Sequence, residues 1–236
     1  MNKPLVIQGL TKSFNNKPAV VDLSLEVESG EIFVLLGPNG AGKTTTIKLI
    51  NGLLAPDKGR ILIGGIDLLE KPELAKARIG LVPDIPFLYE NLTGREFLYL
   101  IGRLRRLEEG AIEQGIETLN PYLDFGDWFD YRCGGYSHGM RQRIMFAQAL
   151  LHKPELLLID EPMVGLDPRA MLKIKKLLRV LKRDGVGIFI STHLIPLAEE
   201  LADRLAVIDH GRLKYCGNRP DFSGRIETIF LNATGD

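Results

Sequence analysis

Residues 31–45 read EIFVLLGPNGAGKTT, an apolar run followed at once by a glycine-rich segment. The apolar run, residues 31–37, has the length of a buried strand and ends in glycine, and the pattern from about Gly42 to Leu53 predicts a helix. A buried strand that leads into a helix is the opening unit of an α/β sheet. This stretch therefore predicts an α/β fold.

The glycine-rich segment, residues 37–44, has the G-x-x-x-x-G-K-T spacing of a phosphate-binding P-loop, between a strand and a helix as that motif requires. Its amide hydrogens can point at phosphate oxygens, with the positive end of the helix behind them. Lys43 would reach the β- and γ-phosphates, and the Thr44 hydroxyl would ligate Mg²⁺. The alternative is a helix-capping turn with an incidental lysine. The residues expected to line the phosphate site are Gly37, Pro38, Asn39, Gly40, Ala41, Gly42, Lys43, Thr44 and Thr45.

A second apolar run, LLLIDEP at residues 156–162, ends in two adjacent carboxylates. In a parallel sheet, ligands bind at the carboxyl ends of the strands. Asp160 is therefore predicted to hold Mg²⁺ through water, and Glu161 to polarise the water that attacks the γ-phosphate. The alternative is a strand that simply meets solvent in two acidic residues.

The pattern outside these two runs divides the chain into parts. Short alternating segments from Leu5 to Glu28 predict antiparallel strands, and a mostly helical stretch follows Asp84, with Thr93 and Glu96 at the spacing of a capping box. Further strands are predicted at 60–63, 79–82, 155–160 and 186–192, further helices at 169–183 and 195–202, and a hairpin around His210-Gly211. The expected single domain, 1–236, has an α/β core that contains the P-loop (1–83 and 152–216), an inserted helical part (84–151) and a weakly patterned tail (217–236).

The composition is that of an ordinary globular protein: 236 residues, 30 Lys+Arg against 30 Asp+Glu, and 45% hydrophobic residues. Such a chain can bury a core without disulfides or metals. Its zero formal charge argues against nucleic acid as a direct ligand. Cys133 and Cys216 lie in neither a CxxC nor a CxxH pattern, which predicts a reducing compartment. No signal peptide and no run of roughly 20 apolar residues is recognised, so the chain is expected not to cross a membrane.

Together these features resemble the ATP-binding subunit of ABC transporters over nearly the whole chain. YSHGMRQR, residues 136–143, is similar to the family's signature motif at the start of a helix. The resemblance implies that Ser137 and Gly139 contact the γ-phosphate bound by the opposite protomer. GLDP, residues 165–168, resembles the D-loop, which implies that Asp167 lies at the dimer interface.

Three further residues gain a role from the same resemblance. His193 in Ser191-Thr192-His193 resembles the switch histidine that contacts the γ-phosphate, although a histidine at a strand end more often has no catalytic duty. Phe14 matches the adenine-stacking aromatic, and a core phenylalanine is the alternative. Val20 matches an aliphatic position near the same ring.

Two positions depart from the family pattern. Asp84 stands where the Q-loop glutamine is expected, and it would bring a carboxylate oxygen to Mg²⁺ together with extra negative charge near the γ-phosphate. His138 replaces the first glycine of the signature, and it is expected to point to solvent. Both departures are tolerated in the exporter-like branch that the chain resembles.

The resemblance implies a P-loop ATPase core with a mixed sheet, an antiparallel β subdomain and an inserted α-helical subdomain. It implies ATP hydrolysis with Mg²⁺, a head-to-tail dimer with a second ATP-binding subunit, identical or a sibling, and polytopic membrane permease subunits that hold the chain at the inner face of the membrane. Pro86, Phe87, Leu88 and Tyr89 are expected to offer the permease a docking surface, with core packing as the alternative. The rival hypothesis is a soluble ATPase switch that moves nothing across a membrane.

Overall fold

The computed structural model, which describes residues 3–161, 163 and 166–235, contains two β-sheets. The six-stranded sheet has the order β10-β9-β3-β8-β7-β6, and the four-stranded sheet has the order β2-β1-β4-β5. The larger sheet consists of β3 (Ile32–Leu36), β6 (Ile79–Val82), β7 (Leu156–Asp160), β8 (Gly187–Thr192), β9 (Arg204–Asp209) and β10 (Arg212–Asn218). The smaller consists of β1 (Leu5–Phe14), β2 (Lys17–Val27), β4 (Lys58–Ile63) and β5 (Ile66–Asp67).

The larger sheet is mixed, because its neighbouring strands are parallel except for the antiparallel hairpin β9–β10. Alternate residues of a strand point to opposite faces. In β3, Ile32 and Val34 belong to the core under the helices, whereas Phe33 and Leu35 belong to the core shared with the smaller sheet. Burial on both faces explains why the strand is a continuous apolar run. The predicted α/β fold with an antiparallel β part is confirmed.

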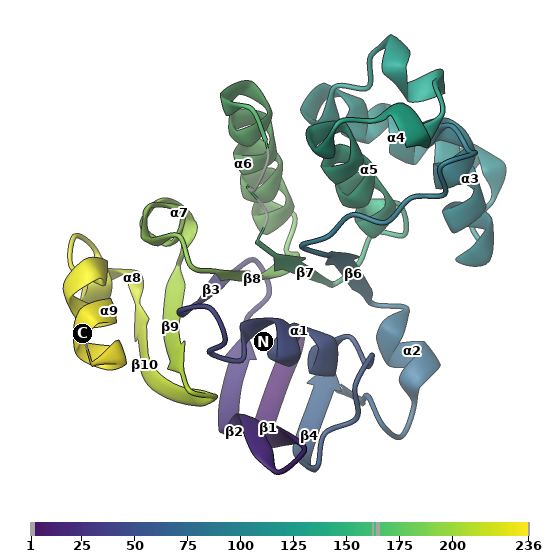
Figure 1. Ribbon diagram of the computed structural model, residues 1–236. Helices are drawn as coiled ribbons and strands as arrows, with labels where there is room; N and C mark the ends of the chain where they lie inside the picture. The colour runs from purple at the N-terminus through teal and green to yellow at the C-terminus, as the bar shows by residue number, and fades with distance from the viewer. Residues whose placement is uncertain (1–2, 162, 164–165, 236) are drawn as a thin grey trace.

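Helix α1 (Lys43–Ile50) lies between the two sheets (Figure 1). Its residues Ile47, Leu49 and Ile50 are buried in the core that the sheets share. The helix begins directly after the glycine-rich loop, so the packing of α1 fixes that loop against the carboxyl end of β3. The remaining helices are α2 (Pro72–Lys76), α3 (Gly94–Leu104), α4 (Glu109–Leu123), α5 (His138–Leu150), α6 (Pro168–Arg183), α7 (Ile195–Leu201), α8 (Arg219–Phe222) and α9 (Ile226–Thr234).

Helices α3, α4 and α5 form the inserted helical part, which stands apart from the antiparallel sheet in Figure 1. The predicted capping box opens α3: the Glu96 amide donates to the Thr93 hydroxyl at 3.1 Å, and the Thr93 amide donates to the Glu96 carboxylate at 2.9 Å. Residues 84–93, expected within the helical stretch, contain no helix. Two short 3₁₀ helices, Asp127–Asp130 and Cys133–Gly135, lie between α4 and α5.

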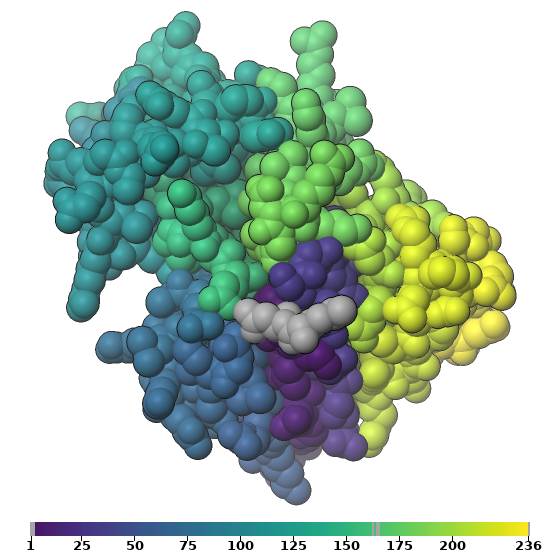
Figure 2. Space-filling view, turned by 180° about the vertical axis from the view of Figure 1, so that it is seen from behind, coloured from purple at the N-terminus to yellow at the C-terminus, as the bar shows by residue number. Residues whose placement is uncertain are grey.

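The tail has more structure than its weak sequence pattern indicates. Asn218 and Asp221 form a capping box at α8, and Phe222 and Ile226 bury their side chains in the core. In the space-filling view from behind, these yellow C-terminal helices lie on one side of the molecule and the teal helical insertion on the other (Figure 2). Among the residues that the structure describes, no helix is both long enough and apolar enough to cross a membrane.

Candidate functional site

The glycine-rich loop requires glycine at two positions for lack of space. A Cβ on Gly42, whose φ is +106°, would lie 2.4 Å from the Ala19 carbonyl oxygen. A Cβ on Gly37 would lie 2.4 Å from the Ile208 carbonyl oxygen. Because glycine has no side chain, the backbone can approach its neighbours this closely at both positions, and the loop can wrap tightly around the N-terminus of α1. This is the geometry that leaves amide hydrogens free for an anion.

The Lys43 side chain is folded back over this loop. Its Nζ donates to the carbonyl oxygens of Gly37 at 2.9 Å and Pro38 at 3.1 Å, and it lies 3.8 Å from Glu161 Oε1. Burial lowers the pKa of the Lys43 ammonium, and the carboxylates of Glu161 and Asp160 oppose that effect. The ammonium therefore stands inside the loop, where a phosphate group would enter.

Asp160 lies at the carboxyl end of β7 and is 4% exposed. The Ser191 hydroxyl donates to Asp160 Oδ1, and the Thr44 side chain also stabilises the charged form of this carboxylate. Burial raises the pKa of the Asp160 carboxyl, the Ser191 and Thr44 side chains lower it, and the negative charges of Asp84 and Glu161 raise it further. A buried carboxylate with carboxylate neighbours favours a cation close by.

Glu161 has a left-handed backbone, with φ +47°, directly after the strand. Its amide donates to the Ser191 carbonyl at 3.0 Å. The Thr192 hydroxyl donates to Glu161 Oε2 at 3.0 Å, and His193 Nδ1 lies 2.8 Å from Oε1. The predicted meeting of Lys43, Glu161 and His193 therefore occurs around one carboxylate.

A pocket of about 230 Å³ is lined by seven of the sixteen predicted nucleotide-binding residues, together with Glu161. Asp84 is exposed at the wall of this pocket, following β6. The lining residues are Ala19, Asn39, Gly40, Gly42, Lys43, Thr44, Thr45, Asp84 and Glu161. One cavity thus joins the glycine-rich loop to the acidic strand end.

The two residues expected near an adenine ring differ in exposure. Phe14, at the end of β1, is 45% exposed, with the Lys12 ammonium 5.8 Å from the ring centroid. Val20 is completely buried in the core of the antiparallel sheet, and the neighbouring Ala19 lines the pocket instead. The expected role of the Val20 side chain beside the adenine is therefore wrong, because this side chain does not reach the pocket.

The signature-like segment lies outside the pocket. Ser137 caps α5 by accepting a hydrogen bond from the Met140 amide at 3.2 Å, while its own amide donates to the Met140 sulfur at 3.3 Å. His138 is exposed, as expected, and Gly139 is partly exposed in the first turn of α5. Neither Ser137 nor Gly139 lines the cavity that contains Lys43. The structure therefore does not join the two halves of the predicted site within one chain.

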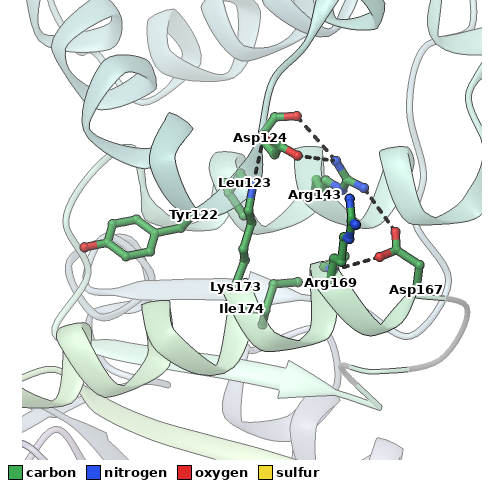
Figure 3. A pocket seen from close by; sticks show the side chains of 9 residues that line it. Tyr122, Leu123, Asp124, Arg143, Asp167, Arg169, Lys173 and Ile174 are labelled. Atoms are coloured by element: carbon green, nitrogen blue, oxygen red, sulfur yellow. Dashed lines mark hydrogen bonds and ion pairs between the residues drawn. The ribbon is translucent and has the colours of Figure 1, made fainter.

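Asp167 caps α6 by accepting a hydrogen bond from the Ala170 amide at 2.9 Å. Its carboxylate also lies 3.4 Å from Arg143 of α5, and Arg143 reaches Asp124 at the end of α4 (Figure 3). Lys173 of α6 pairs with Asp124 at 2.9 Å. This charged network ties the D-loop residue to the signature helix. Of the predicted motif residues, Pro162 and Gly165 lie outside the described residues.

Sequence reasoning assigned no role to the hydroxyls of Ser191 and Thr192, which hold the two carboxylates. This support arises from the parallel pairing of β7 with β8, in which Asp160 is the partner of Ser191. A polar pair at the end of the neighbouring strand could have indicated this support. The sequence likewise gives no signal for the role of Arg143, which lies in the signature segment and pairs with Asp167 and Asp124.

The donor set fits a Mg²⁺ ion that arrives with a nucleotide. In the described ranges, no three His, Cys, Asp or Glu side chains form a metal site by themselves. Mg²⁺ needs fewer protein ligands, because it keeps waters and takes oxygens from one or two carboxylates and from phosphates. The Thr44 hydroxyl, the Asp160 carboxylate and the nearby Asp84 are hard oxygen donors of this kind.

Comparison with known proteins agrees with this geometry. The family described as "ABC transporter" matches residues 20–164. An ABC transporter ATP-binding protein of Bacillus subtilis (strain 168) is 37% identical over 95% of this chain and 74% of its own length. The Nod factor export ATP-binding protein I of Rhizobium sp. (strain N33) is 41% identical over 87% of this chain and 68% of its own.

Among solved structures, an ATP-binding subunit of an ABC transporter superimposes with a TM-score of 0.90 at 33% identity, covering 97% of this chain and 98% of the other. The similarity therefore includes both sheets, the helical insertion and the C-terminal helices. Fold, sequence and phosphate-loop geometry lead to one conclusion. The chain belongs to the ABC transporter family, as an ATP-binding subunit that hydrolyses ATP to drive transport.

Proposed function

We propose that the chain works in a head-to-tail dimer in which each ATP lies between the P-loop of one subunit and the Ser137–Gly139 segment of the other. The observation that carries this proposal is the division of the site. Lys43, Asp160 and Glu161 meet around one pocket, whereas the exposed start of α5 lies outside it. A helix N-terminus that begins with a small hydroxyl residue is a suitable partner for phosphate. The second subunit is a copy of this chain or a sibling.

In this site the residues have separate tasks. The P-loop amides and Lys43 bind the phosphates, Phe14 and Ala19 receive the adenine, and Thr44, Asp160 and Asp84 hold Mg²⁺. When bound, the ion neutralises phosphate charge in the reaction. Glu161 accepts a proton from the attacking water, whose oxygen keeps the electron pair for attack on the γ-phosphate, and His193 orients the carboxylate and the γ-phosphate. Hydrolysis then removes the contacts that join the two subunits, and the dimer opens.

We also propose that residues 85–89 dock a polytopic permease, which places the chain at the inner face of the membrane. The side chains of Ile85, Phe87 and Tyr89 are 80%, 70% and 52% exposed. Together they form an apolar and aromatic surface, and exposure of such a surface to water is unfavourable. Leu88 is buried, so it anchors this segment and is not part of the docking surface that was predicted. Export is the proposed direction, because a relative is named for Nod factor export.

Changing Phe87 and Tyr89 together to serine should reduce recovery of the permease at least tenfold, because the docking surface loses both aromatic rings. Tagged chain would be pulled down from native membranes in mild detergent, and the co-purifying proteins identified by mass spectrometry. Leu172→Ser provides the control, since Leu172 is an equally exposed apolar residue on α6. Equal recovery of one polytopic protein with all variants would contradict the docking surface. Recovery of no membrane partner with the unmodified chain would favour the soluble ATPase switch.

Changing Asp84 to glutamine should preserve Mg-ATP binding to within about threefold. Asp84 is exposed at the pocket wall, and its charge raises the pKa of the Asp160 carboxyl. Its removal therefore leaves Asp160 more readily ionised, and the glutamine carbonyl oxygen remains as a neutral donor. Isothermal calorimetry with Mg-ATP measures the result. An undetectable nucleotide affinity would show that Asp84 is an indispensable ligand.

A further inference from the structure

The segment that follows the exposed aromatic group is hydrogen-bonded to the segment that precedes the signature. The Cys133 amide donates to the Leu92 carbonyl at 2.8 Å, and the Gly134 amide donates to the Glu90 carbonyl at 3.0 Å. Thr93 and Arg132 form an isolated antiparallel bridge between these bonds and α3. Residues 90–94 and 132–136 therefore lie side by side, one leading from the proposed docking surface and the other leading to Ser137.

Tyr136 closes this connection with its side chain. The residue is 6% exposed, and its hydroxyl accepts a hydrogen bond from the Gly94 amide at 2.9 Å while donating to the Phe129 carbonyl at 3.1 Å. Burial raises the pKa of this hydroxyl above its usual range, so it keeps the proton that it donates. The Trp128 ring meets the Tyr136 ring edge to face, with centroids 5.1 Å apart. The hydroxyl thus joins the N-terminus of α3 to the residue immediately before the signature serine.

The fit around this hydroxyl leaves little room for displacement. A Cβ added to Gly94 would lie 2.7 Å from Tyr136 Oη and 2.9 Å from the Phe129 ring. On its other side, the Tyr136 carbonyl accepts a hydrogen bond from Arg141 Nε at 3.2 Å, and Arg141 also bonds the Gly134 carbonyl at 3.2 Å. Tyr136 is therefore held from α3 through its side chain and from α5 through its backbone.

We propose that Tyr136 is a positioning residue that sets the start of α5, and with it Ser137, for contact with the nucleotide of the partner subunit. A displacement of the segment at 85–89 reaches α3 directly, because the rings of Tyr89 and Phe97 lie 6.2 Å apart. The Gly94–Tyr136 hydrogen bond carries that displacement to Ser137. This inference rests on the proposed function, in which Ser137 completes the second half of the ATP site.

Tyr136→Phe should raise the KM for ATP in steady-state hydrolysis about tenfold, with the binding of a fluorescent ATP analogue to dilute, monomeric chain unchanged. The change removes the acceptor of a buried amide and the donor to a buried carbonyl while keeping the ring. Gly94→Ala should give the same split between KM and binding, because the added methyl group displaces the hydroxyl. Tyr131→Phe is the matched control, since Tyr131 lies nearby and is largely exposed.

Ser137→Ala separates failure of the inference from failure of the proposed function. If Ser137→Ala raises KM and Tyr136→Phe does not, the positioning role is overturned and the dimer site stands. If Ser137→Ala has no effect, the proposed role of the signature fails first. If Tyr136→Phe loses both nucleotide binding and thermal stability, the inference is also overturned, because a joint loss indicates a merely structural role.

Hydrogen exchange of the unmodified chain tests the same connection without a variant. Addition of a non-hydrolysable Mg-ATP analogue should slow exchange of the Gly94 amide together with that of Met140 in the first turn of α5. Slower exchange at Met140 with no change at Gly94 would overturn the proposed connection.

Discussion

Replacing Lys43 by alanine is expected to abolish detectable Mg-ATP binding, or to weaken it at least a hundredfold. The ammonium lies inside the phosphate loop, 2.9 Å from the Gly37 carbonyl and 3.1 Å from the Pro38 carbonyl. Its removal leaves the loop carbonyls and the nearby Glu161 carboxylate without their cation, so the pocket becomes repulsive to an anion. Calorimetry of the full chain with Mg-ATP measures the loss.

Lys48→Ala serves as the control for this variant. Lys48 is an exposed lysine on the same helix, so its replacement removes an equal charge without touching the loop. Both variants must show the same cooperative unfolding as the unmodified chain, which excludes a loss of binding through misfolding. Tight Mg-ATP binding by Lys43→Ala would refute the phosphate-binding role of this lysine.

The phosphate loop could be predicted from sequence because its signals are local. The apolar run of β3, the glycines at positions that admit no Cβ and the start of α1 all lie between residues 31 and 53. The capping box of Thr93 and Glu96 is local in the same sense. The structure confirms the capping box, and it confirms the order of strand, loop and helix around the glycines. The fold class followed because such a strand and helix belong to few architectures.

Contacts between distant segments could not be predicted in this way. The support of Asp160 by Ser191 depends on the parallel register of β7 and β8, and the link between Arg143 and Asp167 depends on how α5 packs beside α6. Burial was misjudged for Leu88 for the same reason, since its exposure depends on the helical core that it contacts. A single apolar residue in a loop belongs to no hydrophobic repeat, so the sequence does not indicate whether its side chain points to the core or to solvent.

Glu161→Gln is expected to keep Mg-ATP binding within a few-fold and to lose turnover at least about a hundredfold, in line with the loss of other positioned catalytic groups. The amide has the shape of the carboxylate, so hydrogen bonding with Thr192 and His193 can persist. It cannot take a proton from the attacking water, because the amide nitrogen lone pair is delocalised and the amide oxygen is a weak base. Phosphate release at saturating ATP measures turnover, and calorimetry measures binding.

The two measurements together decide what Glu161 does. If this residue mainly balanced the Lys43 ammonium, which lies 3.8 Å away, its neutralisation would change nucleotide affinity and leave the chemical step intact. If it is the base, the affinity persists and the chemical step fails. Glu117→Gln, an exposed residue of α4, controls for the loss of one negative charge and should leave both quantities unchanged. Near-normal phosphate release by Glu161→Gln would therefore transfer the catalytic assignment away from the acidic strand end and towards His193.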